Sequence, residues 1–79
     1  MIKELDQVVL KKDLPEKGLQ EGDIGTIVLI HQNGEGYEVE FVALDGETIA
    51  VVSLSANQVR SFKRREIANV RSVQLPLAA

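Results

Sequence analysis

Two turn signals constrain the fold of this chain more than any other feature of its sequence. The dipeptides Asn33-Gly34 and Asp45-Gly46 each lie between short segments rich in β-branched residues. Asn, Asp and Gly tolerate the positive φ angles that tight hairpin turns require. Both dipeptides therefore predict β-hairpins, and together they predict a meander of three antiparallel strands.

Centring each hairpin on its dipeptide fixes the register of this meander. The pairs expected opposite one another are Phe41 with Ala50, Val39 with Val52, Tyr37 with Leu54, Val28 with Val39 and Ile30 with Tyr37. One face then collects apolar side chains, namely Ile24, Val28, Ile30, Tyr37, Val39, Phe41, Ala50, Val52 and Leu54. A slip of one residue would turn a strand inside out, so the single apolar face supports this register.

Similar segments continue on both sides of the meander, whereas helical periodicity is weak. Strands are expected at Gln7–Lys11, Ile24–His31, Gly36–Ala43, Thr48–Leu54 and Val59–Phe62, with a candidate sixth at Ile67–Ser72. The stretch Ser55–Gln58 suits a short turn before the last strand. An all-β fold follows, a small SH3-like barrel of five or six antiparallel strands with a long first loop, because closure removes exposed strand edges. An OB-like barrel is the alternative.

The length of 79 residues predicts one domain, near the lower size limit for a stable core. We expect the domain to span 1–72 and the segment 73–79, which contains Pro76, to be a partly disordered tail. The chain has no cysteine, no apolar run long enough for a membrane span, and an acidic N-terminus unlike a signal peptide. These features predict a cytoplasmic protein that works without a membrane.

The long first loop contains three glycines, Gly18, Gly22 and Gly25, which raise the question of a phosphate site. The loop lacks the Gly-Lys-Ser/Thr ending of a P-loop, and no helix is expected after it. We therefore interpret the glycines as turn and strand-entry residues.

The face of the meander opposite the predicted core is unusually apolar for a solvated surface. Glu38 and Glu40 of the middle strand are expected there, surrounded by Ile27, Leu29, Val42, Ile49 and Val51. Something is expected to cover this strip: the chain's own C-terminal tail, a second copy of the chain, or a different protein. An apolar centre with a charged rim is the usual anatomy of a protein interface.

Charge is distributed unevenly along the chain. Residues 1–59 contain four Lys and eleven Asp or Glu, a net charge of −7, whereas residues 60–79 carry five basic residues and one Glu, a net charge of +4. The first loop concentrates acidic residues: Asp13, Glu16, Glu21 and Asp23. The basic cluster is Arg60, Lys63, Arg64 and Arg65. The cluster can pair with the acidic body or bind phosphates, and the loop is a second candidate for a basic partner protein.

No set of catalytic or metal-binding residues can be found in the sequence. His31 is the only histidine, and there is no cysteine with which it could share a metal. A combination of Ser53, His31 and Asp45 can be written down, but a small protein offers such lists by chance. The acidic loop lacks the spacing of a calcium-binding EF-hand. We therefore expect no enzyme activity, no metal and no cofactor.

Two motifs, DLPEKGLQEGDIGTIV at 13–28 and YEVEFVALDGETIAVVSLSANQVR at 37–60, resemble a small bacterial family known as domain of unknown function four-nine-two-six. The resemblance spans nearly all of 1–72 but implies no activity. The order Val8-Val9-Leu10, Gly18, Gly22 and Gly25 is more weakly similar to the KOW motif, whose barrels bind RNA or proteins. The acidic first loop departs from that motif where a nucleic-acid binder would have Lys or Arg.

The sequence thus favours a small binding module that engages a protein, as an accessory subunit or in an antitoxin-like or immunity-like role. The alternative is a KOW-like nucleic-acid-binding module that uses the basic cluster. A homodimer is a further expectation left open by the apolar strip.

Overall fold

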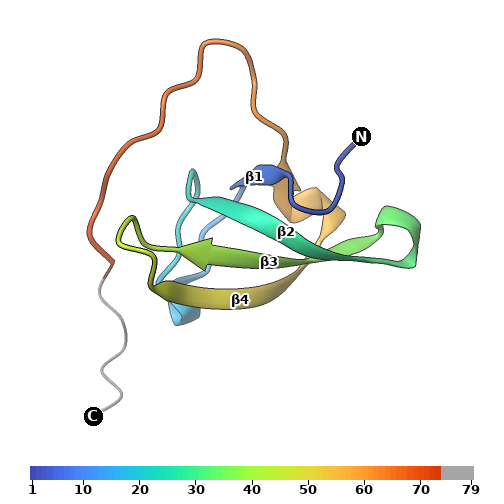
Figure 1. Cartoon of the computed structure of the whole chain (residues 1–79), viewed down its shortest axis with the longest axis horizontal. Helices are drawn as coiled ribbons and strands as arrows, with labels where there is room; N and C mark the ends of the chain where they lie inside the picture. The colour runs from blue at the N-terminus through green and yellow to red at the C-terminus, as the bar shows by residue number, and fades with distance from the viewer. Residues whose placement is uncertain (74–79) are drawn as a thin grey trace.

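The computed structural model describes residues 1–73 of the chain (Figure 1). Its strands are β1 (Gln7–Leu10), β2 (Ile24–His31), β3 (Gly36–Val42), β4 (Thr48–Ser55) and β5 (Val59–Arg60). Three single 3-10 turns connect them, η1 (Pro15–Lys17), η2 (Gln32–Gly34) and η3 (Ala56–Gln58). Residues 74–79, the last six of the expected tail, lie outside the described part of the chain. The prediction that the tail is partly disordered therefore concerns residues that the structure does not describe.

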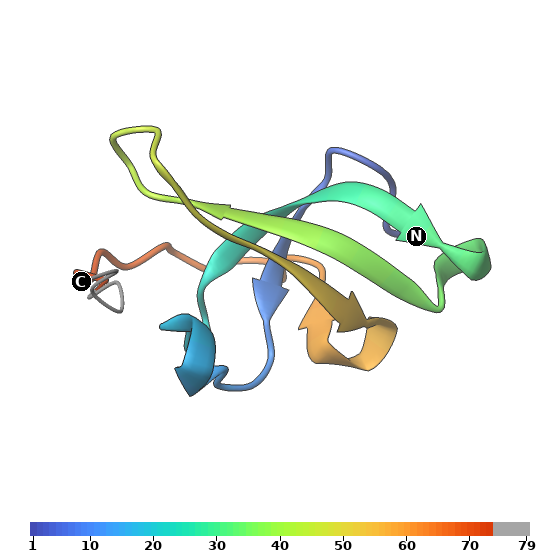
Figure 2. The ribbon, with the colours of Figure 1, turned by 90° about the horizontal axis from the view of Figure 1, so that it is seen from below.

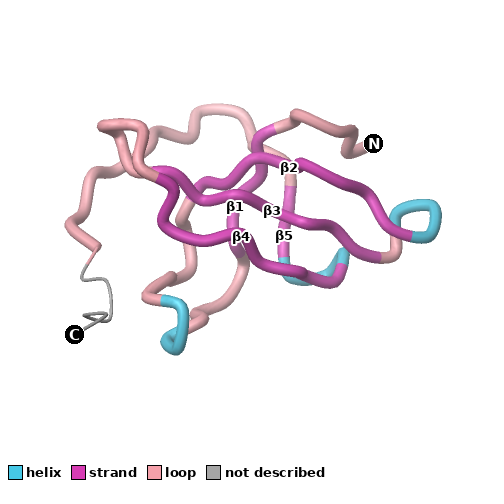
Figure 3. The backbone as a smooth tube through the Cα atoms, turned by 60° about the horizontal axis from the view of Figure 1, so that its bottom comes forward, coloured by secondary structure: helices cyan, strands magenta, loops and turns pink. Residues whose placement is uncertain are grey.

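The strands form one antiparallel sheet in the order β4-β3-β2-β1-β5. Strands β1 to β4 follow one another as a meander, and after η3 the chain returns so that β5 pairs with β1. Figure 3 shows β1 and β5 crossing behind the β2–β3–β4 layer. The predicted all-β domain of five antiparallel strands with a long first loop is confirmed. The sheet is not closed, however, because β4 and β5 are its two ends, so the fold resembles a barrel only loosely.

The candidate sixth strand at Ile67–Ser72 is wrong. Residues 61–73 have no regular structure and run as an extended arm around the sheet (Figures 1 and 2). The strand β5 already pairs with β1 and ends the sheet on that side, and the arm forms no β-ladder with any described strand. The other expected strands are present, and their ends differ from the prediction by two residues or fewer.

The second hairpin has the predicted register. Phe41 lies opposite Ala50, and the two further predicted pairs of this hairpin follow along the strands. The turn itself is longer than a two-residue turn, because the backbone N–H of Ala43 donates to Glu47 O at 2.8 Å. A β-bulge at Ile49 then restores the register that the Asp45-Gly46 centre predicts.

The first hairpin departs from its predicted register halfway along β2. Ile30 lies opposite Tyr37 as predicted, but Val39 faces Ile27 instead of Val28. A β-bulge places Val28 as an extra residue between Ile27 and Leu29. The bulge turns Ile27 into the core, where its side chain is fully buried, and leaves Val28 partly exposed. The predicted positions of Ile27 and Val28 are therefore exchanged.

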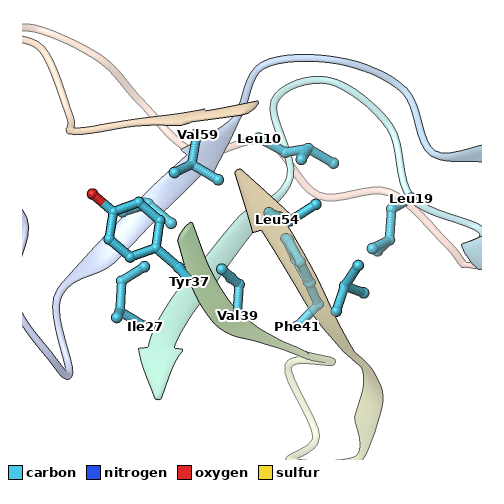
Figure 4. Packing of buried hydrophobic residues seen from close by; sticks show 10 residues of the cluster. Leu10, Leu19, Ile27, Tyr37, Val39, Phe41, Leu54 and Val59 are labelled. Carbon is cyan, nitrogen blue, oxygen red and sulfur yellow. The ribbon is translucent and has the colours of Figure 1, made fainter. Parts of the chain in front are cut away.

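The core lies between the β2–β3–β4 layer and the β1–β5 pair, and Figure 4 shows how its side chains meet. Every strand and the first loop contribute to it: the buried cluster comprises Val8, Leu10, Leu19, Ile27, Tyr37, Val39, Phe41, Val52, Leu54 and Val59. Strand β1 is buried on both sides, because Val9 is buried as well. This short strand is therefore the centre of the fold, which explains its uninterrupted apolar sequence.

The glycines of the first loop serve the backbone, as the sequence indicates, but for two different reasons. Gly18 and Gly22 have φ angles of 71° and 96°, which L-residues rarely adopt. Gly25 does not have a positive φ. A Cβ atom at Gly25 would lie 2.5 Å from Val39 Cγ1 and 2.9 Å from Phe41 Cε1, so this position of β2 must lack a side chain.

Candidate protein-binding face

The outer face of the meander carries exposed apolar side chains on three neighbouring strands. Leu29 of β2 is 45% exposed, Val42 of β3 is 44% exposed and Val51 of β4 is 54% exposed. Val28, displaced by the bulge, adds a fourth side chain with 40% exposure. We call these four residues the outer strip. It stands on a continuous hydrogen-bonded sheet, so the positions of its side chains are set by the register.

Two residues of the predicted strip do not belong to it. Ile27 points into the core because of the bulge in β2. Ile49 is the extra residue of the bulge in β4, and it is partly buried against the core cluster. The outer strip is therefore smaller than the sequence suggests, and Val28, which the sequence assigns to the core, takes the place of Ile27.

Glu38 lies at the centre of the outer face and is held by two hydrogen bonds. His31 Nε2 lies 2.7 Å from Glu38 Oε2, and the Ser53 hydroxyl donates to the same oxygen. These hydrogen bonds, first that of Ser53 and then that of His31, lower the pKa of the Glu38 carboxyl below its usual value of 4.5. A fixed, ionised carboxylate is the result, and it lies opposite Leu29 of β2 and Ser53 of β4.

The cluster around Glu38 is not arranged as a nucleophile with its base. In such a site, the serine hydroxyl would contact the histidine, which the carboxylate would orient from the far side. Here Ser53 and His31 both bond to Glu38, whereas the Asp45 carboxylate accepts a hydrogen bond from Glu47 N at 3.1 Å within the turn. The geometry serves to fix Glu38. Glu40 is fixed similarly, because Thr48 Oγ1 donates to its Oε2 at 2.8 Å.

The acidic first loop uses its two aspartates internally. Asp13 Oδ1 accepts from the backbone N–H of Glu21 at 2.9 Å, which ties the two arms of the loop together. Asp23 Oδ2 accepts from Gln20 N at 2.9 Å. Of the four predicted loop residues, only Glu16 and Glu21 present exposed side chains without such a bond among residues 1–73. A basic partner would therefore meet two carboxylates, not four.

Arg71 is the partner of Asp23 and was not singled out by the sequence. Its Nε donates to Asp23 Oδ1 at 2.8 Å, its Nη2 donates to Asp23 Oδ2, and Nη2 also donates to Gly18 O at 3.1 Å. The excess of positive charge in the C-terminal quarter is the only sequence signal for this pair. The contact fastens the arm 61–73 to the first loop.

The predicted basic cluster is divided in the structure. Arg60 forms a two-pronged ion pair with Glu66, with distances of 3.0 and 2.6 Å. The backbone N–H of Lys63 donates to the same carboxylate, which closes a turn. The Glu66 carboxylate raises the pKa of the Arg60 guanidinium, and the hydrogen bond from Arg60 lowers the pKa of Glu66. Lys63, Arg64 and Arg65 remain exposed on the turn, beside the half-exposed ring of Phe62.

The arm 61–73 does not cover the outer strip. It lies beside β1 and the first loop, from which a hollow of about 430 Å³ separates it; Val9, Ile24, Phe62 and Ile67 are among the lining residues. A second hollow of about 200 Å³ brings the arm near the Val42 end of the strip without burying it. The expectation that the C-terminal tail covers the apolar outer face is therefore wrong for the described part of the tail.

Within residues 1–73, no helix is long and apolar enough to cross a membrane, and no cluster of three or more potential metal ligands occurs. Fold and site together define a small all-β domain with one open antiparallel sheet and an apolar outer face. The chain belongs to the family described as "Domain of unknown function (DUF4926)", whose model matches residues 4–61. The resemblance seen in the two sequence motifs is thereby confirmed. No curated protein and no solved structure gave a significant match.

Proposed function

We propose that this protein is a non-enzymatic binding module that engages another protein through the outer strip. The observation that carries the proposal is the exposure of Val28, Leu29, Val42 and Val51 on a rigid sheet that the arm leaves uncovered. Contiguous apolar surface on a small domain favours an interaction site over simple solvation.

The polar groups of the outer face support a defined partner surface. Glu38 and Glu40 are each held by hydrogen bonds, so little side-chain freedom remains for a partner to restrict. Two acidic side chains beside apolar side chains favour a partner that presents Lys or Arg around an apolar patch. A basic enzyme or subunit fits this description, and the role of accessory subunit, antitoxin or immunity protein remains part of the proposal. The absence of cysteine agrees with a role in the bacterial cytoplasm.

The test is capture of partners from an extract of the host by the tagged full chain and by two variants. Leu29→Lys places a charge in the strip, whereas Leu44→Lys places the same charge at an exposed apolar residue of the β3–β4 turn. We expect a stoichiometric protein to be retained by the wild type and by Leu44→Lys and lost by Leu29→Lys. Equal retention by both variants would place the interface elsewhere.

The second candidate function is nucleic-acid binding by the turn that contains Lys63, Arg64 and Arg65. The half-exposed Phe62 beside these charges favours it, because stacking on an aromatic ring combined with phosphate contacts is typical of single-strand binding. Against it stands the net charge of −3 and the engagement of Arg60 by Glu66.

Filter binding with single-stranded RNA over a range of salt concentrations tests this candidate. Binding through the turn predicts that each neutralised phosphate contributes a slope of about −0.7 in log affinity against log salt. The triple change of Lys63, Arg64 and Arg65 to Gln would then remove about three such contacts, whereas Phe62→Leu would weaken affinity and leave the slope unchanged.

A further inference from the structure

Strand β4 ends the sheet, and no strand pairs with its outer edge within the described chain (Figure 1). It is long for an edge strand, with eight residues from Thr48 to Ser55, whereas the strand at the other end of the sheet, β5, has only two. Exposed edges present unpaired N–H and C=O groups that invite another strand. The β4 edge is therefore the largest unsatisfied feature of the fold.

The register identifies which backbone groups of β4 point to the free edge. The Ala56 N–H donates to Glu35 O at 3.1 Å, at the end of the β3–β4 ladder. Hydrogen-bonded pairs alternate along an antiparallel ladder, so Leu54, Val52 and Ala50 direct their backbone groups toward β3. The residues between them, Val51 and Ser53, direct theirs to the free edge.

At Ser55, the last residue of β4, the chain itself provides a hydrogen-bond partner for the outward backbone N–H. The Ser55 N–H, which the alternation also directs outward, donates to Gln58 Oε1 at 2.8 Å. The η3 turn thus satisfies this group within the chain. No strand of residues 1–73 pairs with Val51 or Ser53 on this side, since β4 ends the sheet there.

Strand β4 also lacks the features that usually protect an edge. Its sequence TIAVVSLS contains no charged residue and no proline. Natural edge strands commonly carry lysine, proline or a charge directed inward to prevent pairing with other chains. The bulge at Ile49 is the one irregularity, and it lies toward one end of the strand.

We propose that β4 pairs in antiparallel fashion with β4 of a second copy of this chain, around a two-fold axis at Val52. This axis places Val51 opposite Ser53 of the second copy, and Ser53 opposite Val51 of the second copy. The outward backbone groups of one strand then meet the outward groups of the other. Such self-complementarity is what a two-fold interface requires. It is the reason to prefer a second copy over a strand from another protein.

The charges of the outer face are compatible with this pairing. Glu38 and Glu40 lie on β3, one strand away from the seam. With strands about 4.8 Å apart, the two acidic rows would be separated by about 14 Å, which exceeds the screening length of about 8 Å at physiological salt. The seam itself brings together only uncharged side chains.

The pairing would join two sheets into one of ten strands, with both outer strips on the same side. The proposal does not rest on the proposed function, because it needs only the edge of β4. It adds that a partner protein would meet a doubled surface. The two-fold closes the assembly, because β5, only two residues long, is left at each end.

Analytical ultracentrifugation of the full chain, from about 1 µM to about 1 mM, tests the seam. We expect a species of twice the 8.7 kDa chain mass to accumulate with concentration. Val51→Lys places two like charges diagonally across the axis, and we expect it to weaken dimerisation at least about tenfold. Leu29→Lys, on the same face but two strands away, should dimerise like the wild type while losing the partner protein.

Amide hydrogen exchange identifies the edge directly and remains informative if a variant unfolds. The N–H groups of Val51 and Ser53 should exchange rapidly in dilute protein and become protected as the dimer forms. Val51→Pro removes one outward N–H and is expected to keep the fold, since proline is tolerated where an edge N–H faces solvent. It should be monomeric.

A wild-type chain that stays monomeric at about 1 mM would overturn the proposal. So would a dimer that forms equally well with Val51→Lys, or one in which the Val51 and Ser53 amides stay unprotected. Protection that appears only when a different protein is added would assign the edge to a foreign strand and equally overturn it.

Discussion

Arg71 and Asp23, which are 48 residues apart, form a two-pronged ion pair that fastens the C-terminal arm to the first loop. The same guanidinium also donates to Gly18 O, so it holds both ends of the turn that precedes β2. Each hydrogen bond to the carboxylate favours the charged guanidinium and raises the pKa of Arg71. An irregular segment is thereby held to the first loop by this side chain, in addition to the Arg60–Glu66 ion pair nearer its start.

Removing this ion pair should release the arm without unfolding the sheet. Arg71→Ala is expected to lower the free energy of unfolding by only about 1 kcal/mol, because the pair is partly exposed. Trypsin should cleave after Lys63, Arg64 or Arg65 several-fold faster in this variant. Arg64→Ala, which removes an exposed charge of the same arm, serves as the control for the stability change. Unchanged cleavage in Arg71→Ala would show that the ion pair does not restrain the arm.

The bulge in β2 predicts opposite consequences for two adjacent residues. Ile27→Ala should destabilise the fold by about 2–5 kcal/mol, since a fully buried side chain is truncated. Val28→Ala should cost less than about 1 kcal/mol, because Val28 is partly exposed. Urea unfolding of both variants measures the difference. A larger loss of stability for Val28→Ala than for Ile27→Ala would contradict the bulge and favour the register in which Val28 is buried.

Gly25 is expected to be intolerant of any side chain. In Gly25→Ala the new Cβ would overlap Val39 Cγ1 and the Phe41 ring, and such overpacking costs about 1–3 kcal/mol. The double variant with Val39→Ala should recover part of that loss relative to Val39→Ala alone. Thermal unfolding of the two single variants and the double variant checks this coupling. Additive effects would mean that the two positions do not touch.

Glu66 should contribute to stability in a pH-dependent way. Its hydrogen bonds from Arg60 and then from the Lys63 backbone lower its pKa from 4.5 to about 2. A depressed carboxyl pKa stabilises the fold fully above about pH 4.5, and the contribution is lost as the pH falls toward 2. Glu66→Gln should flatten this part of the stability profile and change little of its shape above pH 5. An unchanged slope between pH 4.5 and 2 would contradict the assignment.

The turn dipeptides were sufficient to predict most of the sheet. Asp45-Gly46 gave the correct pairing of β3 with β4, although a three-residue turn and a bulge replaced the simple two-residue turn. Asn33-Gly34 gave the pairing next to its own turn, Ile30 with Tyr37. Pairing near a turn is set by the backbone preferences of the turn residues, so it can be predicted from a short stretch of sequence.

The bulges could not be predicted, because they depend on how each strand pairs with strands that are distant in the sequence. Ile27 and Val28 are both β-branched and apolar, so nothing local decides which one is buried. A Cβ atom at Gly25, which lies opposite Val8 of β1, would face the core residues Val39 and Phe41, and Ile27, two residues further along β2, faces the same side. The bulge then brings the Ile30 end of β2 back into phase with Tyr37.

The candidate site was predicted only in part for the same reason. Leu29, Val42 and Val51 are exposed on the outer face as expected, whereas Ile27 and Ile49 were removed from it by the two bulges. The pairing of Arg71 with Asp23 depends on the path of an irregular arm, which no periodic pattern encodes. With the arm held there, the described residues leave the outer strip exposed.

Site-specific photo-crosslinking in the host tests the protein-binding role of the outer strip most directly. A photoreactive phenylalanine derivative would replace Leu29, or Leu44 as the matched exposed control, in the full chain. We predict that irradiation links the chain carrying the probe at position 29 to one discrete partner protein, which the probe at position 44 does not capture. No discrete product from position 29, or the same products from both positions, would contradict the outer strip as the binding face.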